Sequence, residues 1–173
     1  GWRPATAIPI RKDGTGLVPM PGDDSQYDWK GFVPFEEMPY LLNPERGFIA
    51  TANNKTIGDE FPYYISAYWE PPARIARIEE LLKDKTDFEV DDMKAIQTDI
   101  LSDFSRDALP KMIQLAEQQN SLDEKSKLAI GLLKEWDNRH MVSGITPTLF
   151  NTWWVEFINA TYGDEMDQLG DQF

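Results

Sequence analysis

The chain has 173 residues, of which 41% are hydrophobic, and it carries a formal net charge of −13 with an isoelectric point near 4.4. This length and composition suffice for the core of one ordinary domain, or for part of a larger one. The acidic balance argues against a nucleic-acid partner, which needs clustered Lys and Arg, and the absence of cysteine excludes disulfides and cysteine nucleophiles.

The N-terminal part of the chain is rich in residues that stop helices. Residues 1–46 contain seven prolines together with several glycines, a density that forbids long helices and favours short strands joined by turns. Proline restricts such strands to sheet edges or strand ends. The candidate strands are residues 7–10, 17–19 and 32–34. Four aromatic residues are expected to pack beneath the turns, with a substrate platform as the alternative: Trp2, Trp29, Phe32 and Phe35.

From residue 71 onward, apolar residues recur at helical spacing. Pro110 should interrupt the pattern, because a proline in a helix interior costs about 3 kcal/mol. Capping-box patterns at residues 86–89 and 121–124 and the Thr146-Pro147 pair mark helix starts. The expected helices cover residues 71–84, 86 to about 103–106, 108–119, the segment from 121 through Trp136, and 146–163, followed by a fraying acidic tail at 164–173. The predicted fold class is α+β, with a strand-and-turn region at 1–70 and a helical region at 71–173.

Residues 43–54 read Asn-Pro-Glu-Arg-Gly-Phe-Ile-Ala-Thr-Ala-Asn-Asn and form the most informative stretch. Asn43-Pro44 opens a turn, and Gly47 allows a backbone angle that a side chain would resist. Residues 48–52 are rich in β-formers, which predicts a short strand that ends at Asn53 and Asn54. Taken alone, the pattern fits an asparagine-rich surface turn as well as a site.

The neighbouring motifs follow one another in a distinctive order. They are Tyr27-Asp28-Trp29 through Met38-Pro39, Asn43-Pro44, Gly47, Ala52-Asn53-Asn54, Phe61-Pro62, Trp69, and Ala73-Arg74 through Ile78. This series resembles the β subunit of the penicillin amidase (penicillin acylase) family, whose members are N-terminal-nucleophile hydrolases of linear amides. Later motifs extend the resemblance over most of the chain: residues 97–99, 109–110 and 132–137.

The resemblance implies two catalytic residues. Asn53 matches the family's oxyanion-hole asparagine, whose side-chain N–H would stabilise the negative oxygen of a tetrahedral intermediate. Arg74 lies five residues after Trp69, where the family has an arginine that orients the site and the substrate. The alternative role for Arg74 is an ordinary ion pair with a nearby carboxylate. Asn54 is given no catalytic role.

The resemblance also implies that the chain is part of a larger enzyme. The nucleophile of this family begins its chain and uses its own α-amine as the base, and Gly1 has no side chain. We therefore expect an internal segment of the β subunit of an αββα hydrolase, one structural unit that is inactive alone. The expected partners are the remaining β-subunit segments and the α subunit of the same precursor. A non-catalytic binding or scaffold module is the alternative.

Three further expectations concern substrate, location and assembly. The substrate is expected to be a small-molecule amide, and the resemblance implies a periplasmic or secreted location. No apolar run approaches the ~20 residues of a membrane span. Surfaces meant for other segments should make the isolated chain self-associate.

Cofactor and metal chemistry finds little support in the sequence. His140 is the only histidine and lies in a polar stretch beyond a helix end, so we do not expect it to be a catalytic base. The acidic residues between 84 and 107 lack the spacing and glycine of an EF-hand. In the family, a carboxylate between the positions of Pro62 and Trp69 can help to hold calcium. Residues 63–68 contain no carboxylate, which speaks against that calcium site here. No cofactor is expected in this chain, and calcium in the parent protein is implied by the resemblance alone.

Overall fold

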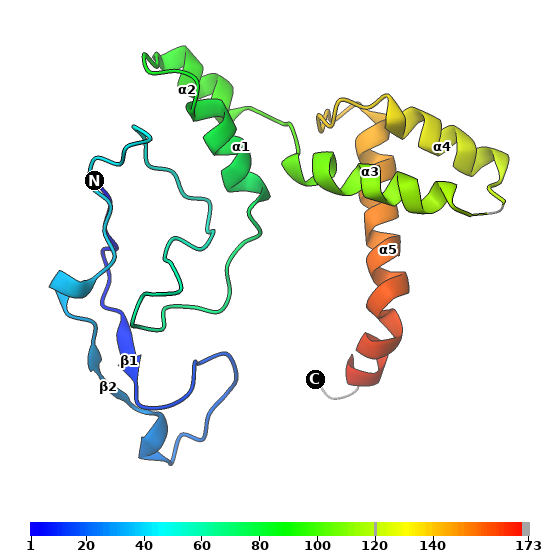
Figure 1. The fold of residues 1–173 in the computed structure, drawn as a ribbon. Helices are drawn as coiled ribbons and strands as arrows, with labels where there is room; N and C mark the ends of the chain where they lie inside the picture. The colour runs from blue at the N-terminus through cyan, green and yellow to red at the C-terminus, as the bar shows by residue number, and fades with distance from the viewer. Residues whose placement is uncertain (120, 171–173) are drawn as a thin grey trace. The chain divides into compact units, whose positions relative to one another are not determined.

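The computed structural model describes residues 1–119 and 121–170, and the chain divides into two compact units, Gly1–Phe88 and Glu89–Phe173. The first unit contains β1 (Pro9–Arg11), β2 (Trp29–Phe32), two short 3-10 helices (Ser25–Tyr27 and Phe35–Glu37) and α1 (Ala73–Leu82). The second contains α2 (Val90–Gln97), α3 (Asp103–Glu117), α4 (Glu124–Lys134) and α5 (Ile145–Gly170) (Figure 1). The α+β class is confirmed.

The only sheet within the described residues is small. β1 and β2 pair antiparallel, with Pro9 opposite Phe32 and an irregularity between Ile10 and Arg11. Beside the sheet, Ile8, Val33 and Met38 form the buried core of this unit. Two of the expected strand segments, 7–10 and 32–34, therefore overlap real strands by one or two residues. The third, 17–19, is not a strand, and Leu17 and Val18 are exposed.

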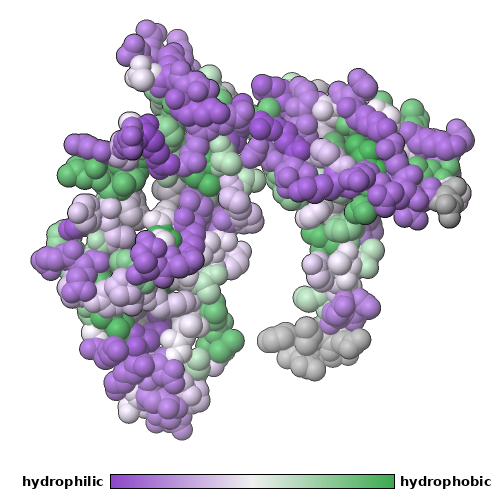
Figure 2. Space-filling view, in the orientation of Figure 1, coloured by the Kyte–Doolittle hydropathy of each residue, from purple (hydrophilic) through white to green (hydrophobic). Residues whose placement is uncertain are grey.

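The expected aromatic cluster is wrong. Trp29, Phe32 and Phe35 are 58%, 54% and 63% exposed. Trp29 and Phe32 touch edge to face with ring centroids 6.0 Å apart, and the Arg3 guanidinium lies 4.2 Å from the Phe35 ring centroid. A core of three apolar side chains is too small to enclose these rings, so they remain exposed. Figure 2 shows hydrophobic residues at the surface of this unit.

Helix α1 begins and ends close to the expected residues 71–84. Pro71 and Pro72 precede its first turn, where proline's missing N–H costs no helical hydrogen bond. Ile75 is the buried residue of the helix, and the Arg46–Glu79 ion pair joins α1 to the preceding segment. The boundary between the two compact units falls after Phe88, so α1 belongs with the strand-and-turn segment. The division into domains at residue 70 stays a prediction.

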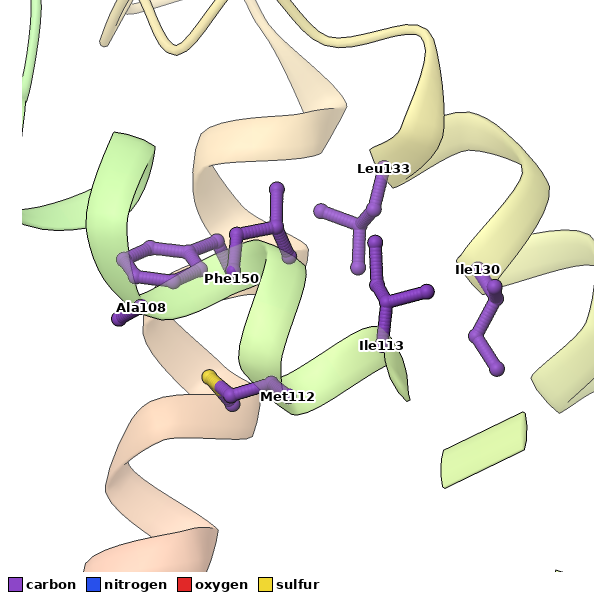
Figure 3. Packing of buried hydrophobic residues seen from close by; sticks show 7 residues of the cluster. Ala108, Met112, Ile113, Ile130, Leu133 and Phe150 are labelled. Atoms are coloured by element: carbon purple, nitrogen blue, oxygen red, sulfur yellow. The ribbon is translucent and has the colours of Figure 1, made fainter. Parts of the chain in front are cut away.

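The core of the second unit lies between three helices. Figure 3 shows side chains from α3, α4 and α5 meeting there, with Ile113 of α3 beside Leu133 of α4 and the Phe150 ring of α5 beneath α3. Phe150 is 1% exposed and Leu133 is 2% exposed. The buried members are Ala108, Leu109, Met112, Ile113, Ile130, Leu133 and Phe150.

The helix boundaries around Pro110 differ from the prediction. The capping box that begins α2 is made by Glu89 and Asp92, not by residues 86–89, and α2 ends at Gln97. The next helix, α3, is capped by the Ser102 hydroxyl, which accepts a hydrogen bond from the Ser105 N–H at 3.1 Å, and it continues through Pro110. Burial of the α3 side chains on both sides of this proline offsets its cost.

The helical spacing of Val90, Met93, Ile96, Ile100 and Phe104 predicts one buried helix face, and this prediction is wrong. Val90, Met93 and Ile100 are exposed, and α2 ends at Gln97, before Ile100. Phe104 instead belongs to α3, where its ring lies 4.8 Å from that of Trp154 and 5.9 Å from that of Phe150. The expected face therefore divides between two helices.

Helices α4 and α5 also depart from the predicted pattern. The Asp123 carboxylate caps α4 by accepting a hydrogen bond from the Ser126 N–H at 2.7 Å, and Ile130 and Leu133 are its buried residues. Leu128 and Leu132 also recur at helical spacing, which predicts that they are buried, but both are exposed. Helix α5 continues through Gly163 to Gly170, because one glycine in a helix interior costs only about 1 kcal/mol. Of the tail expected to fray, residues 171–173 lie outside the described residues.

Candidate active site

The candidate site lies on the segment from Asn43 to Asn54 and on the start of α1, all within the first unit. The segment opens with a tight turn in which the Gly47 N–H donates to the Pro44 carbonyl at 2.9 Å. Gly47 has a φ of 78°, which glycine adopts without steric cost. The sequence predicts that Gly47 allows a backbone angle that a side chain would resist, and its positive φ matches this prediction.

The strand expected at residues 48–52 is not present in the described structure. These residues are rich in β-formers, but a strand needs a neighbour that accepts its backbone hydrogen bonds, and the sheet of this unit contains only β1 and β2. Side chains hold the segment instead. The Arg46 Nε donates to the Phe48 carbonyl at 3.1 Å, and the Arg46 Nη1 forms an ion pair with Glu79 of α1.

Asn53 and Arg74 contact each other directly. The Arg74 Nη2 donates to the Asn53 Oδ1 at 2.9 Å and to the Ala52 carbonyl at 2.8 Å. Arginine has no acceptor, so the atom of the Asn53 amide that faces it must be the oxygen. The Asn53 Nδ2 is thereby left to donate elsewhere, and Asn53 is exposed.

The backbone of Asn53 is fixed as well as its side chain. Asn53 has a φ of 62°, in the left-handed region that asparagine tolerates better than most residues. Its carbonyl accepts a hydrogen bond from the Glu70 N–H at 3.0 Å. The preceding Ala52 is buried. An exposed amide is thus carried on a backbone that is held from both sides.

Asn54 has a different environment from Asn53. Its Oδ1 accepts a hydrogen bond from the Ala52 N–H at 3.0 Å, and its Nδ2 donates to the Lys55 carbonyl at 3.1 Å. Both ends of the amide therefore stabilise the local turn, as asparagine side chains do in such positions. The contacts agree with giving Asn54 no catalytic role.

A pocket of about 360 Å³ lies beside this segment. Asn54 and Thr51 line it, together with the Arg46–Glu79 ion pair and the aromatic side chains of Trp2 and Tyr40. The lining combines apolar surface with charged groups of both signs. The turn that carries Asn53 therefore borders a space large enough for a small molecule.

Glu70 is the residue of this site that the sequence interpretation missed. Its carboxylate lies 3.9 Å from the Arg74 Nη2, and its N–H holds the Asn53 carbonyl. The signal was the spacing of four residues between an acid and a base, which places ion pairs together at the start of helices. Pro71 and Pro72 lie between the two residues and are typical of a helix start, so the sequence did not indicate that Glu70 pairs with a residue of the helix.

His140 lies in the second unit and takes part in its packing. Its ring centroid is 5.1 Å from that of Trp136 and 6.4 Å from that of Phe150, and the backbone N–H of His140 donates to the Ile100 carbonyl at 2.9 Å. Within the described residues, no group of three or more His, Cys, Asp or Glu side chains could hold a metal ion. Every described helix is too short or too polar to cross a bilayer.

The whole chain, residues 1–173, matches the family model of penicillin amidase, so it belongs to the penicillin amidase family. The penicillin acylase 2 proenzyme of Pseudomonas sp. (strain SE83) is 40% identical over 95 residues, which are 55% of this chain and 12% of that protein. The acyl-homoserine lactone acylase QuiP of Pseudomonas syringae pv. syringae is 41% identical over 81 residues, or 47% of this chain and 10% of that protein.

A solved structure supports the same assignment. The thermostable penicillin G acylase from Alcaligenes faecalis matches with a TM-score of 0.62 and 26% identity, over 85% of this chain and 28% of that one. The chain thus spans between a tenth and a third of the length of these relatives. The family expected from the order of motifs is confirmed.

Proposed function

We propose that this chain is a segment of an acylase that hydrolyses linear amide bonds, in which the Asn53 side chain stabilises the oxyanion of the reaction. The observation that carries the proposal is the 2.9 Å hydrogen bond from the Arg74 Nη2 to the Asn53 Oδ1. This contact sets the orientation of the Asn53 amide, which leaves its N–H₂ group as the donor. A preorganised donor of this kind is what a developing oxyanion requires.

The proposed reaction has two steps. A hydroxyl nucleophile from a segment outside these residues attacks the amide carbonyl, its proton passes to the free α-amine of the same residue, and the carbonyl oxygen becomes negative. The Asn53 Nδ2 donates to that oxygen. The tetrahedral intermediate then collapses, the amine leaves with a proton, and water later hydrolyses the acyl-enzyme. Arg74 keeps the Asn53 amide in place through both steps.

The names of the relatives suggest the class of substrate. Two are penicillin acylases and one is an acyl-homoserine lactone acylase. Penicillins and acyl-homoserine lactones both contain a linear amide next to an acyl chain. We propose a small molecule with such an amide, either a β-lactam side chain, an acyl-homoserine lactone or another acylated amine.

The proposed setting follows from the family. The partners are the other segments of the β subunit and the α subunit of the same precursor, and the proposed location is the periplasm or the outside of the cell. The short coverage of the relatives supports a larger parent protein. The 173-residue chain purified alone is proposed to lack amidase activity.

The test is substitution of Asn53 in the processed full-length enzyme. Asn53→Ala should lower kcat by about 10²- to 10³-fold, the usual loss when one oxyanion donor is removed. Asn43→Ala is the matched control, because Asn43 and Asn53 have φ values of 45° and 62°. Both substitutions strain a left-handed position by about 1–2 kcal/mol, but only one removes the donor. Undiminished turnover of Asn53→Ala, or an equal loss in Asn43→Ala, would exclude the role.

A further inference from the structure

The Arg74 guanidinium uses one nitrogen for both of its contacts with the Asn53 turn. The Nη2 group has two N–H bonds, and it donates to the Ala52 carbonyl at 2.8 Å and to the Asn53 Oδ1 at 2.9 Å. The Arg74 side chain is nevertheless 57% exposed, and a long exposed side chain samples several rotamers unless something restrains it. The orientation of the Asn53 amide therefore depends on what restrains Arg74.

Glu70 touches both members of this pair. Its carboxylate Oε2 lies 3.9 Å from the Arg74 Nη2, and its backbone N–H donates to the Asn53 carbonyl at 3.0 Å. The separation of 3.9 Å is an electrostatic contact and not a hydrogen bond, which fits a nitrogen whose two protons are already used. Pro71 and Pro72 follow directly and fix their own φ angles, so few backbone rotations separate Glu70 from α1.

We propose that Glu70 is a positioning residue that acts on Asn53 through Arg74. Its charge favours the one Arg74 rotamer in which Nη2 bridges the Ala52 carbonyl and the Asn53 Oδ1. That rotamer in turn holds the Asn53 N–H₂ group toward the oxyanion. This inference rests on the proposed function, and it adds a residue to which neither the family resemblance nor the comparisons assign a role.

The carboxylate can be tested separately from the backbone of Glu70. Glu70→Gln keeps the size of the side chain and the backbone N–H but removes the charge. In the processed full-length enzyme it should lower kcat by about two- to five-fold, the range of a partly exposed ion pair. KM should change by less than about two-fold, because the lost interaction acts on a group that binds only in the transition state. Glu36→Gln, at an exposed glutamate of the same unit outside the segment that carries the site, is the matched control and should leave kcat unchanged.

A double-mutant cycle shows whether the effect passes through Arg74. In an Arg74→Gln background, Glu70→Gln should have no further effect on kcat, because the group on which the carboxylate acts is gone. The loss caused by Glu70→Gln alone should also shrink as salt screens the pair. An unchanged kcat in Glu70→Gln, or the same fold-loss with and without Arg74, would overturn the inference. If Asn53→Ala still lowers kcat in that case, the proposed function stands and only the role of Glu70 fails.

Discussion

The carboxylate of Asp123 begins helix α4, and its charge should make the stability of the chain depend on pH. The hydrogen bond from the Ser126 backbone N–H is the main cause that lowers the pKa of Asp123 below the ordinary value of 3.8 for an aspartate. Because the native pKa is the lower one, ionised Asp123 stabilises the fold above pH 3.8. That contribution is lost as the pH falls from about 4 through the native pKa.

Urea denaturation of the chain at several pH values tests this prediction. Asp123→Asn keeps the capping oxygen but cannot ionise, so it should be less stable than the wild type at pH 6, and this difference should shrink as the pH falls below about 4. Asp123→Ala removes the acceptor and should be less stable at both pH 6 and pH 3. If the difference in the free energy of unfolding between wild type and Asp123→Asn is the same at pH 3 as at pH 6, the prediction is wrong.

Local sequence patterns predict the turns of the site but not the contacts between residues far apart in the chain. The turn at Pro44 to Gly47 and the paired asparagines are visible in the sequence, because turn residues act through their own backbones. The contact between Asn53 and Arg74 joins residues more than twenty positions apart, and no local pattern predicts it. The family resemblance implies both residues, and they contact each other in the structure. Glu70 was missed although its spacing to Arg74 was the one local signal.

Among the helices, α3 best shows the limits of a rule applied to one residue. Pro110 predicts a break because its ring clashes with the preceding turn and its nitrogen carries no proton. The prediction fails because Ala108, Leu109, Met112 and Ile113 lie around it and are buried together. Tertiary burial of several side chains outweighs one lost hydrogen bond, and the sequence does not state which side chains will be buried.

Replacing Pro110 should therefore stabilise the chain. Pro110 is exposed, so Pro110→Ala restores a helical N–H without removing core contacts. Removing the proline should relieve about 3 kcal/mol of destabilisation in the helix. The more flexible unfolded chain of the alanine variant offsets up to about 1 kcal/mol of this gain. The free energy of unfolding should therefore rise by about 2 kcal/mol. Chemical denaturation followed by circular dichroism measures it.

Pro147 provides the control for that substitution. It lies in the first turn of α5, where no helical hydrogen bond requires its N–H, and it is buried. Pro147→Ala should consequently lower the free energy of unfolding, the opposite sign to Pro110→Ala. A loss of stability in both variants would show that α3 is not strained at Pro110.

The segment at residues 48–52 shows that local β-propensity alone does not determine where a strand forms. β-Branched and aromatic side chains favour an extended backbone, but pairing depends on a neighbour that can be far away in the chain. The Arg46–Glu79 ion pair and the hydrogen bond from Arg74 to the Ala52 carbonyl fix the segment instead, and these contacts exist only in the folded unit. The α+β class was predictable because the prolines of the N-terminal part and the periodic C-terminal part set it locally.

At the scale of the whole molecule, two opposing features govern association. Large apolar side chains are exposed in both units, among them Trp29 and Phe32 in the first and Leu115 and Leu128 in the second. Such surface favours contact with other protein. The net charge of −13 opposes it through repulsion between copies. Which effect dominates should therefore depend on ionic strength.

The isolated chain should self-associate, and more strongly in salt. At about 1 M salt the Debye length falls to ~3 Å from ~10 Å at 0.1 M, so repulsion weakens while apolar burial persists. Light scattering over a range of concentrations should give a mass above the 19.9 kDa of one chain, and the excess should grow with salt. The double variant Trp29→Ser/Phe32→Ser should reduce it more than Val142→Ser, which removes a single, smaller exposed side chain. A mass of one chain at every concentration and salt level would show that the exposed apolar groups are too dispersed to drive association.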